Sequence, residues 1–300
     1  MGLWRRGLML ILLVVAAAGI WSGVAEASGV RFVNVGHIRM AYRVSGEGRP
    51  LVLIPGSGMA MDVWDPLFLR GLSQRHRVIV FDPRGVGLSS GVGTTLTIQR
   101  MGDDAARLIH VLRLDHPDVM GWSIGGFVAE KLAVRHPRLV RRLVLASSDA
   151  GGSHAIRASA AIQELDDQVT LGQASLDQIL SLLFPPEGLQ AGMAWLQRIF
   201  SQPGCCETVP PETAVRQVAA ERLWFRPRHG VYSRLPTIHQ ITLVIDGSKD
   251  IDVPIANAHM LANRIPNSQL KIFHHAGHAF LFQYPNRAAD QINAFLQSPD

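Results

Sequence analysis

The chain has 300 residues, of which 47% are apolar and 18% are charged, and this length and composition are sufficient for a large buried core. Its formal net charge of +5 comes from 29 basic and 24 acidic residues. The basic residues are scattered rather than clustered with aromatic side chains, so the sequence argues against nucleic acid as a partner.

The first 27 residues have the three parts of an export signal. Arg5 and Arg6 form a short basic region, an apolar stretch follows, and Ala25-Glu-Ala27 supplies the small-x-small pattern that precedes signal-peptidase cleavage. We therefore predict a signal peptide over residues 1–27 and an exported protein that is secreted, periplasmic or associated with the cell envelope. The alternative is an uncleaved membrane anchor, because residues 7–25 contain no charge and are just long enough to span a bilayer.

Apolar runs alternate with helical patterns on both sides of a central stretch. This alternation predicts an α/β fold with a mostly parallel central sheet and flanking helices, formed by residues 28–148 and 236–300. The predicted strands are residues 32–35, 38–44, 50–54, 77–81, 116–120, 140–147, 241–246 and 269–274, and the predicted helices are residues 62–73, 97–112, 124–136, 254–264 and 285–297.

Residues 149–235 break this alternation. They contain no clear strand, and proline pairs at 185–186 and 210–211 indicate several short helices separated by turns. We predict that this segment is a helical cap inserted into the core. Its apolar clusters, at residues 180–184, 195–200 and 223–225, either line an acyl pocket that favours an apolar substrate or form the interior of the cap. Its adjacent Cys205 and Cys206 form a vicinal disulfide, a bond between chains or two free thiols.

Gly121-Trp-Ser-Ile-Gly125 places one serine between a predicted strand and a predicted helix. A strand that turns abruptly into a helix forces the central residue into a strained backbone conformation, and Gly121 and Gly125 allow the strand and the helix to approach. The turn exposes the hydroxyl of Ser123 at a helix N-terminus, where backbone N–H groups stabilise a developing negative charge. Ser123 is therefore the candidate nucleophile.

A serine hydroxyl needs a base to take its proton and an acid to orient that base. Asp250 follows the apolar run 241–245, and His278 follows the run 270–273. The resulting order of serine, acid and histidine differs from that of chymotrypsin and subtilisin. We predict Ser123, Asp250 and His278 as a catalytic triad. Asp252 and Asp149 are the competing candidates for the acid.

Together these motifs resemble the α/β-hydrolase family over nearly all of the sequence after residue 27, and most closely its cofactor-free serine esterase and haloperoxidase-like branch. Leu51-Val-Leu-Ile-Pro-Gly-Ser-Gly58 is similar to the family's strand and oxyanion loop, with Pro55 where the family usually has histidine. Phe81-Asp-Pro-Arg-Gly-Val-Gly-Leu-Ser89 resembles a second family loop, in which we expect Asp82 and Arg84 to pair. The resemblance implies no cofactor, and it implies that the backbone N–H groups of Ser57 and Ile124 form the oxyanion hole.

A serine nucleophile favours acyl transfer, whereas haloalkane dehalogenases and epoxide hydrolases of this fold use aspartate. The favoured hypothesis is an exported hydrolase that cleaves a small-molecule carboxylic ester through an acyl-enzyme on Ser123. The alternatives are another acyl-transfer enzyme on the same triad, namely an acyltransferase, lactonase, amidase or perhydrolase, and a non-catalytic binding protein. We predict no metal site, because Gly277 indicates that His274, His275 and His278 lie on a loop rather than on a rigid element.

Overall fold

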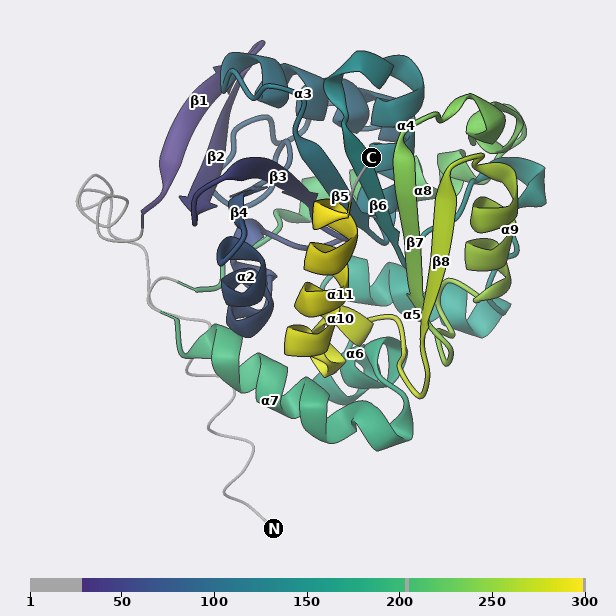
Figure 1. Cartoon of the computed structure of the whole chain (residues 1–300). Helices are drawn as coiled ribbons and strands as arrows, with labels where there is room; N and C mark the ends of the chain where they lie inside the picture. The colour runs from purple at the N-terminus through teal and green to yellow at the C-terminus, as the bar shows by residue number, and fades with distance from the viewer. Residues whose placement is uncertain (1–28, 203–204, 299–300) are drawn as a thin grey trace, which may run out of the picture.

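A computed structural model describes residues 29–202 and 205–298 of the chain. Its centre is an eight-stranded sheet of order β1-β2-β4-β3-β5-β6-β7-β8, in which β1, β2 and β4 pair antiparallel and all pairs from β4–β3 to β7–β8 are parallel (Figure 1). The strands are β1 (Arg31–Val35), β2 (Ile38–Ser45), β3 (Arg49–Ile54), β4 (His76–Phe81), β5 (Asp118–Trp122), β6 (Arg142–Ala146), β7 (Ile241–Gly247) and β8 (Ser268–Phe273). The predicted fold class is therefore confirmed.

Helices cover both faces of the sheet. One apolar core lies between the sheet and α3 (Ile98–Val111), α4 (Ile124–Arg135) and α9 (Ala256–Arg264). The other lies between the opposite face and α2 (Pro66–Ser73), α10 (Phe280–Gln283) and α11 (Pro285–Gln297). The helix predicted over 62–73 is divided, because Asp65 caps α2 by accepting a hydrogen bond from the N–H of Leu67 and Pro66 occupies its first turn.

All the regular elements described between β6 and β7 are helices. This segment contains α5 (Ala160–Thr170), α6 (Leu176–Leu183), α7 (Leu189–Phe200) and α8 (Pro211–Trp224), and no strand occurs among its described residues. Ser175 and Gln178 form a capping box that begins α6. In Figure 1 the parallel strands point toward α5, α6 and α7, so this segment covers the carboxyl ends of the strands. The boundaries of a separate cap at 149 and 235 stay a prediction.

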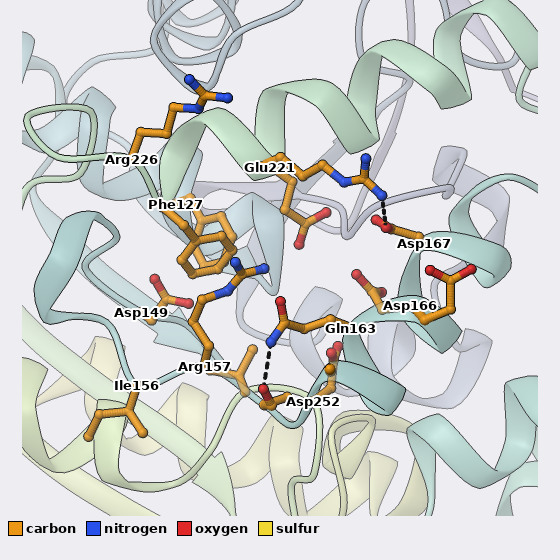
Figure 2. A pocket seen from close by; sticks show the side chains of 16 residues that line it. Phe127, Asp149, Ile156, Arg157, Gln163, Asp166, Asp167, Glu221, Arg226 and Asp252 are labelled. Carbon is orange, nitrogen blue, oxygen red and sulfur yellow. Dashed lines mark hydrogen bonds and ion pairs between the residues drawn. The ribbon is translucent and has the colours of Figure 1, made fainter.

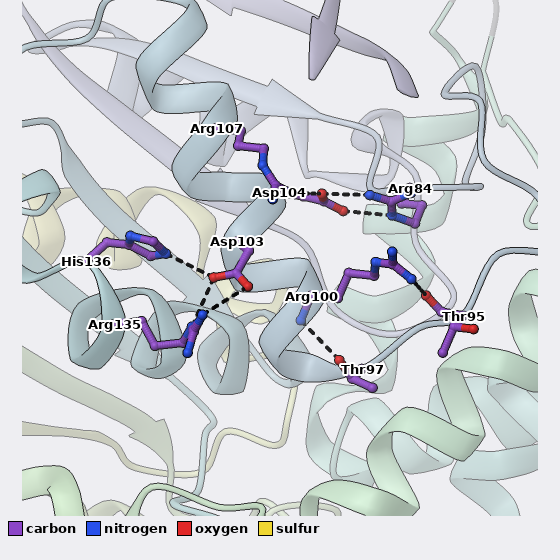
Figure 3. Close-up of polar contacts among 9 residues, drawn as sticks. All are labelled: Arg84, Thr95, Thr97, Arg100, Asp103, Asp104, Arg107, Arg135 and His136. Carbon is purple, nitrogen blue, oxygen red and sulfur yellow. Dashed lines mark hydrogen bonds and ion pairs between the residues drawn. The ribbon is translucent and has the colours of Figure 1, made fainter. Parts of the chain in front are cut away.

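Arg84 does not pair with Asp82, and that expectation was wrong. The Nε and Nη2 atoms of Arg84 donate to the two carboxylate oxygens of Asp104 on α3, at 2.8 and 2.7 Å (Figure 3). Asp82 instead accepts hydrogen bonds from the backbone N–H groups of Met61 and Leu88. Asp82 therefore joins the backbone segments that contain Met61 and Leu88, while Arg84 joins its own loop to α3.

A second ion pair links α3 to the end of α4. Asp103 accepts hydrogen bonds from Arg135 and from His136, each at 2.9 Å to its Oδ1 atom (Figure 3). This pair is more exposed than the first, since 40% of the Arg135 side chain is accessible, against 9% of that of Arg84. The second contact therefore fixes α3 against the helix that begins directly after Ser123, and the first fixes α3 against the loop after β4.

We predict that Asp104→Ala lowers the free energy of unfolding by about 3–5 kcal/mol, because it leaves the Arg84 guanidinium buried without its carboxylate. Asp103→Ala on the same helix removes the more exposed pair and should cost only about 0–1 kcal/mol. Urea unfolding of the two variants measures the difference. Equal losses in both would show that the burial of Arg84 does not set the strength of its ion pair.

Candidate active site

Ser123 lies at the junction of β5 and α4 in the strained conformation that the sequence predicts. Its backbone angles, φ 56° and ψ −128°, lie in a region that residues other than glycine rarely occupy. Its N–H donates to the carbonyl of Ala146 on the neighbouring strand β6, at 2.9 Å. The hydrogen bond holds the junction against the sheet, so the hydroxyl position is determined by the backbone.

Gly121 and Gly125 are needed because backbone atoms approach them too closely for a side chain. A Cβ atom on Gly121 would overlap the carbonyl of Gly125, and a Cβ atom on Gly125 would overlap the carbonyls of Ile54 and Pro55. The second overlap shows that the start of α4 packs directly against the loop after β3. This loop contains Ser57, so the two predicted oxyanion donors belong to segments that touch.

His278 follows β8 and forms a hydrogen bond with Asp250, which follows β7. Its Nδ1 atom lies 2.8 Å from Oδ2 of Asp250, and both side chains are almost completely buried. The carbonyl of His278 accepts hydrogen bonds from Nε1 of Trp122 at 3.0 Å and from Oγ of Ser147 at 3.1 Å. The ring of His278 also contacts the indole of Trp122, the residue before Ser123, with 5.3 Å between the ring centroids.

The second polar contact of the imidazole is with Asp252. Nε2 of His278 lies 3.4 Å from Oδ2 of Asp252, and within the described residues no hydrogen bond joins the ring to Ser123. Burial alone would lower the pKa of His278, but the charges of Asp250 and Asp252, the hydrogen bond with Asp250 and the charge of Asp246 outweigh it and raise this pKa to about 10. The structure thus shows a histidine between two carboxylates.

Of the three candidate acids, Asp250 is the one that reaches Nδ1 of the histidine. Asp149 instead accepts hydrogen bonds from the N–H of Gly151 and from Nε1 of Trp224. Sequence reasoning missed Asp246, a fully buried carboxyl in β7 that accepts hydrogen bonds from Oγ of Ser147 and from the N–H of Gly247. Burial and the nearby charge of Asp250 raise its pKa well above the ordinary value. An aspartate inside an otherwise apolar strand was the signal available in the sequence.

The helical segment between β6 and β7 contacts the loop that contains Ser57. Oγ1 of Thr170, at the end of α5, donates to Oγ of Ser57 at 3.2 Å, and Oε1 of Gln217 on α8 accepts from the N–H of Gly58 at 3.0 Å. Ile124 is the first residue of α4, so its N–H has no acceptor within that helix. The predicted donor Ser57 therefore belongs to a loop that the helical segment contacts directly.

A cavity of about 480 Å³ lies between α4, α5, α8 and the loop after β7, and neither Ser123 nor His278 belongs to its lining. Asp252 lines this cavity and contacts His278, so it connects the two. Figure 2 shows the side chains of Glu221, Asp166 and Asp252 directed into the same space. The ionisable residues of the lining are Asp149, Arg157, Glu164, Asp166, Asp167, Glu221, Arg222, Arg226 and Asp252.

Four carboxyl groups around this cavity have raised pKa values. Burial raises the pKa of Asp149 to about 7 and that of Asp252 to about 6. Burial and neighbouring carboxylates raise the pKa values of Asp166 and Glu221 well above their ordinary ranges. Asp167 forms an ion pair with Arg222. The lining is therefore polar, and several of its carboxyl groups take up a proton more readily than they would in water.

The apolar clusters of the helical segment mostly pack elsewhere. Leu180, Leu183 and Phe184 join Trp195 and Ile199 in the core that also contains α10 and α11. From the third cluster, Trp224 stacks on Phe127 and is buried, while Phe225 lines the cavity. The clusters at residues 180–184 and 195–200 therefore contribute to the core of the protein rather than to an apolar acyl pocket.

Cys205 and Cys206 are joined by a disulfide bond. This outcome is one of the three alternatives that the sequence leaves open. The predicted signal peptide at residues 1–27 lies outside the described residues. Within residues 29–202 and 205–298, no helix is both long enough and apolar enough to cross a membrane.

The fold and this arrangement of side chains define a hydrolase of the α/β type, and comparison with known proteins agrees. Residues 51–291 match the alpha/beta hydrolase family. The chain is 30% identical over 271 residues to the 2-hydroxymuconate semialdehyde hydrolase of Pseudomonas sp. (strain CF600), covering 88% of this chain and 92% of the relative. The chain therefore belongs to the alpha/beta hydrolase family.

Solved structures of related proteins superpose on most of the chain. An alpha/beta hydrolase fold protein from Chitinophaga pinensis has a TM-score of 0.80 and 26% identity, covering 91% of this chain and 98% of that protein. A thermophilic esterase from Thermogutta terrifontis has a TM-score of 0.69 and 25% identity, covering 89% of this chain and 98% of the esterase. The similarity extends over the sheet, the flanking helices and the segment between β6 and β7.

We predict that Gly121→Ala lowers the free energy of unfolding by about 3 kcal/mol and sharply reduces any activity that depends on Ser123, because the new methyl group overlaps backbone rather than a movable side chain. Thermal unfolding and labelling by a serine-directed fluorophosphonate measure the two effects. Gly102→Ala in α3 is the control, since its Cβ would lie 3.3 Å from the Cβ of Lys131 and should change stability by less than about 1 kcal/mol. Normal stability and labelling in Gly121→Ala would contradict the need for a close approach.

Proposed function

We propose that this protein is a serine hydrolase that cleaves carboxylic esters through an acyl-enzyme on Ser123. The observation that supports this most directly is the 2.8 Å contact between Nδ1 of His278 and Asp250, together with a serine held in a strained conformation at the start of a helix. An ionised carboxylate at Nδ1 fixes the tautomer that leaves Nε2 available as a base.

In the proposed mechanism, Oγ of Ser123 attacks the ester carbonyl while Nε2 of His278 takes the hydroxyl proton. The N–H groups of Ser57 and Ile124 donate to the oxyanion that forms. Collapse of this intermediate transfers the proton from His278 to the departing alkoxide and leaves an acyl group on Ser123. A water molecule deprotonated by His278 then attacks the acyl group and releases the acid. Asp250 stabilises the charged imidazole in both steps.

The cavity that Asp252 lines indicates which chemical class of substrate the site accepts. Its volume suits a small molecule, and six of its lining residues are carboxylic acids against three arginines. A long alkyl chain in this cavity would remove carboxyl groups from water without giving them hydrogen bonds. We therefore propose short or polar esters as substrates, in place of the apolar substrate that the clusters of the helical segment suggest from sequence.

A second candidate substrate comes from the relatives. The chain shares 30% identity with a 2-hydroxymuconate semialdehyde hydrolase, so this compound belongs in the substrate panel beside the esters. It is an anion, and an excess of carboxylates in the cavity disfavours an anion unless they are protonated. Other acyl-transfer reactions on the same triad pass through the same acyl-enzyme. They differ from hydrolysis only in the acceptor, which is an alcohol, an amine or peroxide in place of water.

We predict that Ser123→Ala and His278→Gln each abolish hydrolysis of p-nitrophenyl esters, and that Asp250→Asn lowers kcat by about 10⁴-fold because the ring loses its orienting carboxylate. Rates for acetate, butyrate, octanoate and dodecanoate esters should fall with chain length. Ser123→Ala should retain the unfolding temperature of the unaltered protein within a few degrees.

Several outcomes would decide between the candidates. Hydrolysis that persists in purified Ser123→Ala would overturn the role of this residue. A preference for the dodecanoate ester would contradict the proposal of short or polar esters and support the apolar acyl pocket that the sequence suggests. Turnover of 2-hydroxymuconate semialdehyde without ester hydrolysis would replace the ester proposal, and a folded protein that no fluorophosphonate labels would favour a binding protein.

We also propose that the chain is exported and that residues 1–27 are removed. The support is the basic, apolar and small-residue pattern of this segment. Expression in a bacterial host should give a protein whose N-terminal residue, determined by mass spectrometry, is Ser28. A full-length chain that remains in the membrane fraction would instead establish residues 7–25 as an anchor.

A further inference from the structure

The imidazole of His278 faces a carboxylate at each of its two nitrogen atoms. Asp250 lies 2.8 Å from Nδ1 and Asp252 lies 3.4 Å from Nε2. The side chain of His278 is 2% exposed and that of Asp250 is fully buried, whereas that of Asp252 is 13% exposed on the cavity side. Water therefore competes poorly for either nitrogen.

This geometry favours one protonation state of the ring. A neutral imidazole has a single N–H and presents a lone pair at its other nitrogen, which an ionised carboxylate would repel. An imidazolium donates from both nitrogens and attracts both carboxylates. The pKa of His278, which its charged neighbours raise to about 10 against the effect of burial, agrees with a doubly protonated ring in the free protein.

We propose that Asp252 is a positioning residue that holds His278 in an unreactive orientation in the free enzyme, so that Nε2 becomes the base for Ser123 only when its contact with Asp252 is broken. The proposal rests on the proposed function of Ser123 and His278. It accounts for the observation that Nε2 contacts Asp252 and, within the described residues, makes no hydrogen bond with Ser123.

Asp252 is placed so that it can release the ring. Its backbone N–H, like that of Val253, is bound to Oδ1 of Asp250, so the loop is held independently of the Asp252 side chain. That side chain also lines the cavity, where a substrate would displace it or change its charge. The carboxyl group of Asp250 has no such freedom, because its two oxygens bind the ring and the loop.

Charged groups from several elements surround this pair. Within the described residues, acids predominate, and each of them disfavours a second negative charge on its neighbours. They are Asp246 and Asp250 from β7 and the loop after it, Asp149 from the segment after β6, Asp166 from α5 and Glu221 from α8, with Arg157 as the nearby cation. Removing the one charge that contacts Nε2 therefore changes the ring most directly.

The test is the pH dependence of Asp252→Asn, which keeps the shape of the side chain and removes its charge. The acid limb of kcat/KM reports the ionisation of His278 in the free enzyme. Removing a unit charge 3.4 Å from Nε2 should move this limb to lower pH by roughly one to three units. The pH dependence of the rate of fluorophosphonate labelling should move with it. If Asp252→Asn is unstable, Asp252→Ala should shift both profiles in the same direction.

The matched control is Asp290→Asn on α11, an exposed position that changes the net charge equally and should leave both profiles in place. A structural role for Asp252 would change stability or rate without moving the acid limb. Identical limbs in the unaltered protein and both Asp252 variants would overturn the proposal.

A second readout separates this proposal from the proposed function. Proton NMR titration of the His278 ring, assigned by comparison with His278→Gln, should give a lower pKa in Asp252→Asn than in the unaltered protein. An unchanged pKa in a protein that is labelled at Ser123 would overturn only the role of Asp252. Absence of labelling at any pH would overturn the catalytic assignment, together with the role of Asp252 that depends on it.

Discussion

The close approach of backbone segments around Ser123 is the constraint on which the rest of the site depends. β5, the start of α4 and the end of β3 meet with no space for a Cβ atom at Gly121 or Gly125. Ser123 is held in a strained conformation between them, at a cost of about 1–3 kcal/mol that the surrounding sheet and helices must offset. The positions of the candidate nucleophile and of the predicted oxyanion donors therefore follow from backbone packing rather than from side-chain contacts.

Sequence patterns predicted the features that local chemistry determines. The strands, most helices and the strained junction at Ser123 follow from hydrophobic periodicity and glycine positions, and the fold class is confirmed. The contacts that were missed or mistaken involve residues distant in sequence. Arg84 finds Asp104 rather than Asp82, because partners for a buried guanidinium depend on which helix packs above the loop. Likewise, nothing in the spacing of Asp250 and Asp252 indicated that they would flank the same ring.

The segment between β6 and β7 was the least accurately interpreted part of the chain. Its apolar clusters predicted either a pocket or a core, and periodicity does not distinguish these two environments. The structure uses most of them as core and places carboxyl groups around the cavity instead. The sequence pattern predicted no role for the charged residues on α5 and α8 that line this cavity. Only the packing of these two helices over the carboxyl ends of the strands turns these residues inward.

The same segment is attached to the loops beneath it at several separate points. Besides the contacts of Thr170 and Gln217 with the Ser57 loop, Arg198 on α7 pairs with Asp65, and the N–H of Glu207 binds Asp62. The bond from Gly58 to Gln217 is made by the peptide group immediately following Ser57. Ser57, one of the two predicted oxyanion donors, is therefore separated by a single peptide group from a direct hydrogen bond to α8, a helix that also lines the cavity.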